Sequence, residues 1–190
     1  MPSTSLTLAV VIGLVLLVAI LLYNRLVAYR QRVRNGWAQI DVQLKRRHDL
    51  IPNLVASVKG YMAHERGLFD RIAQARSAAI AAGSDVPRRA AAEAELTAGL
   101  RSLFAVAEAY PDLKASTNML ALQEELSSTE NRIAFARQFF NDAVLAYNTA
   151  RETFPSSLIA TLFGFAPETP FAAAETERAL PQVDFGDAVR

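Results

Sequence analysis

The stretch LTLAVVIGLVLLVAILLY, from Leu6 to Tyr23, decides the architecture of this chain. It carries no charge, and only Thr7 and Gly13 interrupt its aliphatic pattern. Eighteen residues are enough for a membrane-spanning helix, because the hydrocarbon core takes about 17–25 residues at about 1.5 Å each. A cleaved signal peptide would need a basic start and a small-x-small site, and residues 1–5 hold no Lys or Arg. We therefore predict a transmembrane helix within residues 1–25.

A basic block follows this stretch directly. Residues 24–47 hold seven cations and one acid, whereas the other residues hold 13 cations and 18 acids. Cations after the span and none before it predict a single-pass protein with its N-terminus outside and its larger part in the cytoplasm. We expect Leu6 and Leu14 in the lipid, and Tyr23 and Arg25 at its interface.

The basic block also bears on partners. Beside a membrane span, each cation is attracted to anionic headgroups by about 1 kcal/mol, so membrane lipid is the expected partner. Nucleic acid is not expected, because no aromatic stacking platform or recognised motif accompanies the charge.

Apolar residues continue after the span in steps of three and four, which is the spacing of one helix face. They are Leu26, Val33, Trp37, Ile40 and Leu44. The membrane helix is therefore predicted to run on to His48, about 65 Å from Leu6. In QLKRRHDLIPNLV, residues 43–55, Pro52 is tolerated mainly in a first helical turn, and Asp49 would cap a helix starting at Leu50. We predict a reversal or sharp kink there.

Three further helices are predicted in the rest of the chain. The second carries apolar residues from Ile51 to Ile80 and ends at GSDVP, residues 83–87. The third runs from there to YPDL, residues 110–113, and the fourth starts at a Ser116 or Thr117 cap and reaches Tyr147. Short connections imply antiparallel neighbours, so the fold class is all-α, with the transmembrane helix continuing into an antiparallel four-helix bundle over residues 26–153.

Residues 154–166, FPSSLIATLFGFA, carry no charge and are too few to span a bilayer. We expect them to cap the open end of the bundle; the alternative is a short interfacial or partner-binding helix. Residues 167–190 are predicted to be weakly ordered.

A polar stripe runs along the fourth predicted helix at the margin of its apolar face. At about 100° per residue its members fall within roughly 40° of one another. Partly buried polar groups need partners, and we expect polar residues of the other helices to provide them in a network that fixes the register. The stripe is Glu130, Arg137, Asn141 and Asn148, and the expected partners are Asp41, Arg46, Arg47, Asp49, Glu65 and Glu108.

An enzyme is not expected. A carboxylate-bridged di-iron bundle needs Glu-x-x-His on two helices, and neither His48 nor His64 follows a Glu by three residues. The chain has no cysteine, no nucleophile elbow and no phosphate-binding loop. We expect no catalytic residue, metal ligand or cofactor.

Two aromatic residues of the fourth helix lie off its core stripe. Phe135 and Phe139 project about 140° and 100° away from the stripe's centre. Exposed rings there suggest a second buried surface, covered by the C-terminal segment or by another copy. We therefore predict a homo-oligomer, with self-association residues Phe135, Phe139, Leu158, Leu162 and Phe163.

Four stretches carry a resemblance that covers nearly the whole chain. They are RNGWAQIDVQLKRRHDLIPNLVASVKGYMAHE (34–65), EAYPDLKAS (108–116), LQEELSSTENRIAFARQFFNDAVLAYN (122–148) and FPSSLIATLFGF (154–165). In these stretches the chain resembles the LemA family. The resemblance implies a small bacterial protein with one membrane helix and a helical bundle at the inner membrane, and it supplies no catalytic residue. Phe140 stands where the family's R-x-x-Y-N pattern has tyrosine, so no hydroxyl role is carried over to it.

The expected function follows from architecture and resemblance together. Relatives in magnetosome membranes imply a role in organising or remodelling membranes. The leading hypothesis is a non-enzymatic, membrane-anchored scaffold that self-associates. The alternative is a monomeric membrane-tethered adaptor for a membrane protein partner, such as an envelope protease or signalling protein.

Overall fold

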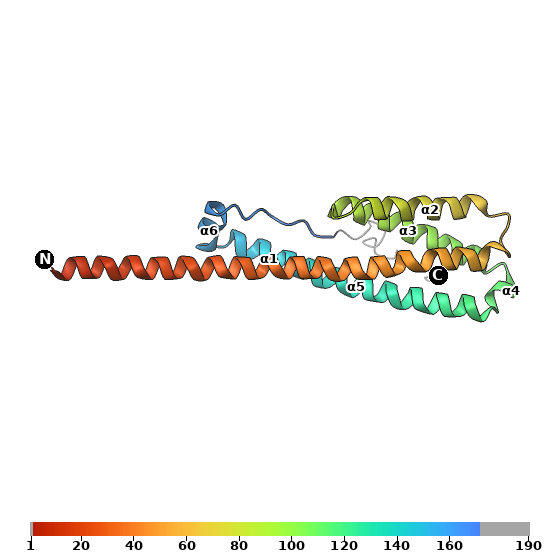
Figure 1. Cartoon of the computed structure of the whole chain (residues 1–190), viewed down its shortest axis with the longest axis horizontal. Coiled ribbons are helices and arrows are strands. Elements are labelled where there is room, and N and C mark those ends of the chain that lie inside the picture. The colour runs from red at the N-terminus through yellow and green to blue at the C-terminus, as the bar shows by residue number, and fades with distance from the viewer. Residues whose placement is uncertain (1, 172–190) are drawn as a thin grey trace, which may run out of the picture. The chain divides into compact units, whose positions relative to one another are not determined.

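The computed structural model describes residues 2–171, and every regular element within them is an α-helix. The all-α prediction is therefore confirmed. The helices, shown in Figure 1, are α1 (Pro2–Lys59), α2 (Arg66–Ala81), α3 (Val86–Ala107), α4 (Pro111–Lys114), α5 (Thr117–Glu152) and α6 (Ser156–Leu162). The weak order predicted for residues 167–190 falls, from 172 onward, outside the described residues.

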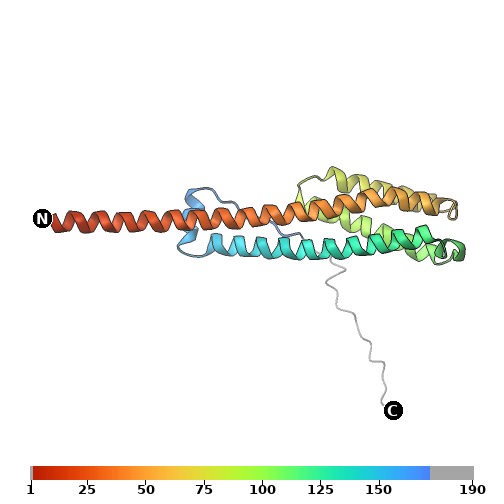
Figure 2. The same cartoon turned by 60° about the horizontal axis from the view of Figure 1, so that its bottom comes forward.

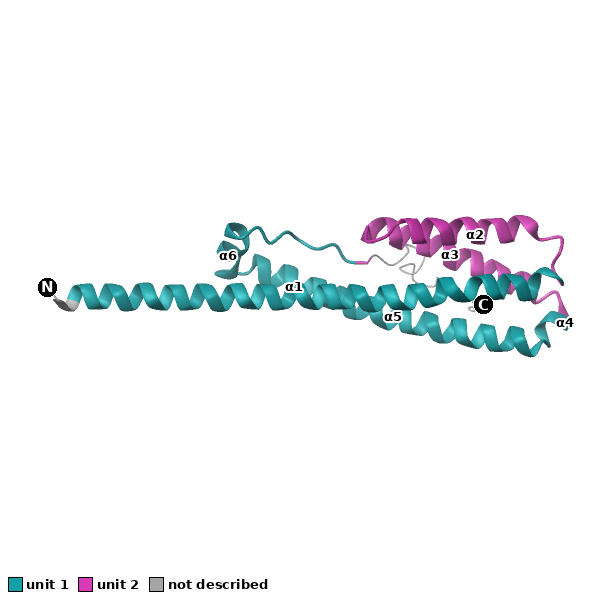
Figure 3. Ribbon diagram, viewed as in Figure 1, with its two compact units in different colours: residues 1–60, 112–170 teal, residues 61–111, 171–190 magenta. Residues whose placement is uncertain are grey.

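The chain divides into two compact units, coloured separately in Figure 3. Unit 1 comprises residues 1–60 and 112–170, and unit 2 comprises residues 61–111 and 171–190. Each unit holds one pair of long antiparallel helices, α1 with α5 in unit 1 and α2 with α3 in unit 2. That the two pairs form one four-helix bundle stays a prediction.

Unit 1 is built on the contact between α1 and α5, which lie side by side in Figures 1 and 2. Their apolar stripes are the ones that the periodicity predicts, with Leu26, Ile40 and Leu44 of α1 and Phe140 and Tyr147 of α5 all buried. Residues separated by three or four positions share one helix face, so both helices bury a continuous line of side chains.

The two helices approach each other closely where Gly36 meets Phe140. A Cβ at Gly36 would lie 3.0 Å from the Phe140 Cα and 3.3 Å from its Cβ. Trp37, half-buried on the next position of α1, places its ring centroid 5.6 Å from that of Phe140. Phe140 therefore fills an apolar contact in which a tyrosine hydroxyl would need a partner.

The reversal predicted within residues 43–55 is wrong, because α1 continues through Pro52 as far as Lys59. Proline inside a helix costs about 3 kcal/mol, since it removes a hydrogen bond and clashes with the preceding turn. The helix nevertheless buries Ile51, Leu54 and Val58 almost completely, and each such side chain contributes about 1.5–3 kcal/mol. Burial of this stripe outweighs the proline cost, and Asp49 is exposed in mid-helix instead of capping one.

Unit 2 begins just after α1 ends, and its first helix is shorter than predicted because α1 extends to Lys59. The chain turns after Lys59, and α2 starts only at Arg66. Ile80, the last of the apolar residues assigned to the second predicted helix, is half exposed near the end of α2. The break at residues 83–87 is confirmed: Gly83 adopts a φ of +57°, and the Asp85 carboxylate caps α3 by accepting the Arg88 N–H at 3.1 Å.

The Gly36 contact yields a stability prediction. Gly36→Ala should destabilise the protein, because the new methyl group meets the α5 backbone at 3.0 Å and overpacking costs about 1–3 kcal/mol. The better helix propensity of alanine, about 1 kcal/mol, offsets this only in part. Thermal melts of the full-length protein in detergent, followed by circular dichroism, measure the change. Gly67→Ala is the control, because no atom lies within 4 Å of its added Cβ, and a Gly36→Ala melt at or above the parent's would contradict the close contact.

Candidate functional site

The polar stripe on α5 meets α1 through a buried cation. The Arg47 side chain is 1% exposed and pairs with Glu130, whose side chain is 40% exposed. One residue earlier, Arg46 pairs with Glu125 at 2.8 Å, and these two side chains are 47% and 42% exposed. The structure thus brings together the predicted residues Arg47 and Glu130. Glu125 lies about 140° around α5 from Glu130, outside the predicted polar stripe, so the sequence did not identify it.

The other residues predicted for this network are spread over the chain. Arg137 and Asn141 are half-buried on α5, and Asp41 and Asp49 are exposed on α1. Glu65 and Glu108 belong to unit 2, where they stand next to the ends of α2 and α3.

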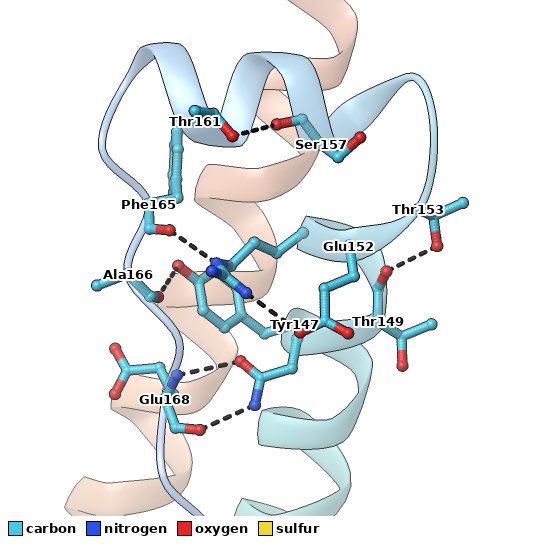
Figure 4. A network of polar contacts seen from close by, with 11 residues as sticks. Tyr147, Thr149, Glu152, Thr153, Ser157, Thr161, Phe165, Ala166 and Glu168 are labelled. Carbon is cyan, nitrogen blue, oxygen red and sulfur yellow. Dashed lines mark hydrogen bonds and ion pairs between the residues drawn. The ribbon is translucent and has the colours of Figure 1, made fainter.

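Asn148 binds main chain and not another helix. The C-terminal strap, residues 165–170, runs back from α6 and is drawn in Figure 4. The Asn148 amide donates to the Glu168 carbonyl at 2.8 Å and accepts the Glu168 N–H at 3.0 Å. The Arg151 Nε donates to the Phe165 carbonyl at 2.9 Å. Polar side chains within little more than one turn of α5 therefore hold this segment in place.

The third of these side chains is a buried tyrosine. The Tyr147 hydroxyl donates to the Ala166 carbonyl at 2.7 Å (Figure 4). Burial raises the pKa of this hydroxyl, and the nearby Glu168 carboxylate raises it further. The hydroxyl is therefore protonated at neutral pH and serves as a hydrogen-bond donor.

Aromatic side chains gather where the apolar run of α1 ends. The Tyr23 ring centroid lies 4.9 Å from that of Phe163 and 5.6 Å from that of Phe165, both edge-on. The Arg30 guanidinium lies 4.9 Å from the Phe165 ring centroid, a distance typical of a cation–π contact. Arg25, predicted at the membrane interface, donates to the Tyr29 hydroxyl at 3.4 Å.

A shallow apolar groove lies between α1 and α5. Phe135 is 73% exposed and Phe139 is 45% exposed, and both rings line it. The groove has a volume of about 600 Å³, and neither α6 nor the C-terminal strap lines it. Its lining is Ala38, Gln39, Val42 and Gln43 from α1 with Arg132, Phe135, Ala136 and Phe139 from α5.

The N-terminal part of α1 is long and apolar enough to cross a membrane, and none of its most apolar 18-residue window is buried against the rest of the chain. Leu6 and Leu14, both predicted to face lipid, are exposed. In residues 2–171, no group of three or more His, Asp or Glu side chains is arranged to hold a metal ion.

Comparison with known proteins identifies relatives over most of this length. The model of the LemA family matches residues 36–185. Magnetosome protein MamQ of Magnetospirillum gryphiswaldense is 26% identical over 91% of this chain and 75% of its own length. Magnetosome protein MamQ 2 of Paramagnetospirillum magneticum is 25% identical over 96% and 78%, and protein LemA of Metamycoplasma hominis is 26% identical over 82% and 71%.

The Arg47–Glu130 pair yields a second prediction. Glu130→Ala should destabilise the protein by about 2–3 kcal/mol, because it leaves a buried guanidinium without this carboxylate. The loss is below the 3–5 kcal/mol typical of fully buried pairs, since water reaches Glu130. Thermal melts measure it, and Glu125→Ala, which breaks the exposed pair, is the matched control with an expected loss below about 1 kcal/mol. Equal melting temperatures for the two variants would show that Glu130 stabilises the protein no more than Glu125 does, and would contradict the prediction.

Proposed function

This chain belongs to the LemA family, and from this premise we propose that it is a non-enzymatic, membrane-anchored scaffold whose helices α1 and α5 self-associate beside the membrane. The observation that carries the proposal is the groove between these helices with its two exposed rings. Its family and the apolar N-terminal part of α1 indicate a membrane-associated protein.

The groove is suited to a second copy of the same surface. Its lining includes one formal charge, Arg132, and the Phe135 ring projects from its edge. In a two-fold arrangement each copy would insert this ring into the groove of the other, as isologous interfaces do. Burying one phenylalanine contributes about 1.5–3 kcal/mol, which alone supports only weak association in solution.

Membrane anchoring changes this balance. An anchor on α1 confines all copies to one plane, which raises their effective concentration and lets modest contacts drive assembly. Similarity to magnetosome proteins extends the proposal to organising or remodelling the membrane. The alternative is a monomeric adaptor, because an apolar groove between two helices also accepts an amphipathic helix of another protein.

The proposed orientation places the helical units in the cytoplasm, at the inner membrane of a bacterium. The support is the charge distribution, with seven cations in the 24 residues after the span and none before it.

Reporter fusions test this orientation. A reporter joined after Arg190 should behave as cytoplasmic and one joined before Leu6 as exported, because Lys and Arg are retained on the cytoplasmic side. Ser3→Arg combined with Ser5→Arg is the control variant, since cations before the span should weaken the bias. An exported C-terminal reporter in the parent protein would overturn the orientation.

Self-association is tested by size-exclusion chromatography with light scattering on the full-length protein in detergent. The parent should form oligomers, and Phe135→Ser with Phe139→Ser should shift it to smaller species with unchanged helicity. Leu120→Ser with Leu145→Ser is the matched control, because these two exposed side chains of α5 lie outside the groove. A parent that is monomeric at all concentrations would refute the scaffold and favour the adaptor. A double groove variant that unfolds would show that the rings are covered within one chain.

A further inference from the structure

We propose that α6 is a second membrane contact, whose outer face lies among the lipid headgroups and upper acyl chains next to the point where α1 leaves the bilayer. The inference rests on the proposed anchoring of α1 in the membrane. It assigns to lipid three side chains, Leu158, Leu162 and Phe163, for which self-association was the expectation from sequence.

The most exposed side chains of α6 and of the residues at its two ends are large and apolar. Phe154, Leu158, Leu162 and Phe163 are 57–76% exposed. The small residues Ser156 and Ala160, on the opposite side of the helix, are buried instead. A short helix that packs through its small residues and presents its large apolar ones outward is poorly suited to water. Residues 154–166 also carry no charge, so nothing in the segment resists entry into an interface.

The position of α6 identifies what covers this face. Phe163, directly after α6, packs on Tyr23, the last residue of the apolar run of α1. Figure 1 shows α6 beside α1 at the inner end of its free N-terminal part. The next turns of α1 bring Arg25 and Arg30, and Arg30 stacks on Phe165. Aromatic rings followed by cations are the composition of a membrane–water boundary, so the outer face of α6 stands at the level of the headgroups.

The C-terminal strap fixes α6 at this level. Tyr147, Asn148 and Arg151 of α5 hold the main chain of residues 165–168 through four hydrogen bonds of 2.7–3.0 Å. The backbone directly after α6 is thus tied to the same helix pair that carries the span. Its charged side chain, Glu168, lies on the strap, beyond α6. The outer face of α6 therefore meets lipid whenever α1 is inserted.

Single cysteines can test this directly, because the chain contains none. Leu162→Cys is labelled with an environment-sensitive fluorophore in the full-length protein, reconstituted in vesicles of phosphatidylcholine and phosphatidylglycerol. Leu14→Cys, within the span, and Leu120→Cys, at the opposite end of α5, are the matched controls. Brominated acyl chains quench labels from the lipid, and acrylamide quenches them from water.

The label at Leu162 should emit at shorter wavelength than the label at Leu120. It should also be quenched by brominated lipid, as at Leu14, and be less sensitive to acrylamide. A Leu162 label that behaves like Leu120 would overturn the inference. A label protected from acrylamide but not quenched by brominated lipid would also overturn it, and would assign α6 to a protein interface.

Failure of the premise gives a different result. If the Leu14 label is not quenched by brominated lipid, the anchoring of α1 is wrong and the lipid contact of α6 falls with it. Quenching at Leu14 without quenching at Leu162 refutes the role of α6 alone. A second label at Phe154→Cys, on the same uncharged segment and equally exposed, should report as Leu162 does and guards against a local effect of one substitution.

Discussion

The close packing of α1 on α5 at Gly36 is the contact on which the rest of unit 1 depends. Without a side chain at this position, the Phe140 backbone approaches α1 to a distance that a Cβ would block. The same proximity allows Arg47 to reach Glu130. It also brings the two helices close enough to form both walls of the groove. A larger spacing would lengthen the ion pair and leave buried Arg47 without its carboxylate. The weakened ion pair would then no longer offset the free energy that it costs to bury the guanidinium.

The sequence predicts which faces of α1 and α5 are buried, and fails where a local signal competes with burial. Steps of three and four residues identify Leu26 to Leu44 and Leu126 to Tyr147, because that spacing directly reflects a helix packed on one side. The reversal predicted at Pro52 is wrong because the proline destabilises only its own turn of helix. Burying Ile51, Leu54 and Val58 stabilises the whole length of helix that carries them. A rule based on helix propensity includes the proline penalty and leaves out the gain from burial.

The site is less predictable than the fold, because its contacts use the main chain or cross between helices. Asn148 falls on the predicted stripe, yet its partners are the N–H and carbonyl of Glu168, which any residue except proline would offer at that position. The residue type at position 168 therefore does not reveal that its main chain binds Asn148. Glu125 is missed because Arg46 and Arg47 leave α1 in different directions and meet different sides of α5. The exposed rings Phe135 and Phe139 are found correctly, since their angle to the core stripe follows from helix geometry alone.

The exposed apolar surfaces of unit 1 differ in their distance along α1 from the end of its apolar run. The outer face of α6 stands at Tyr23, whereas the groove begins at Ala38, fifteen residues and about 22 Å farther along the helix. A headgroup layer is too thin to cover both, since the polar regions add only about 5–8 Å to each side of the hydrocarbon core. A lipid contact at α6 therefore leaves the groove in water, where an exposed phenylalanine pair gains only by meeting protein. Because one continuous helix carries both surfaces, inserting α1 fixes the height of the groove above the membrane and presents it at the same level in every copy.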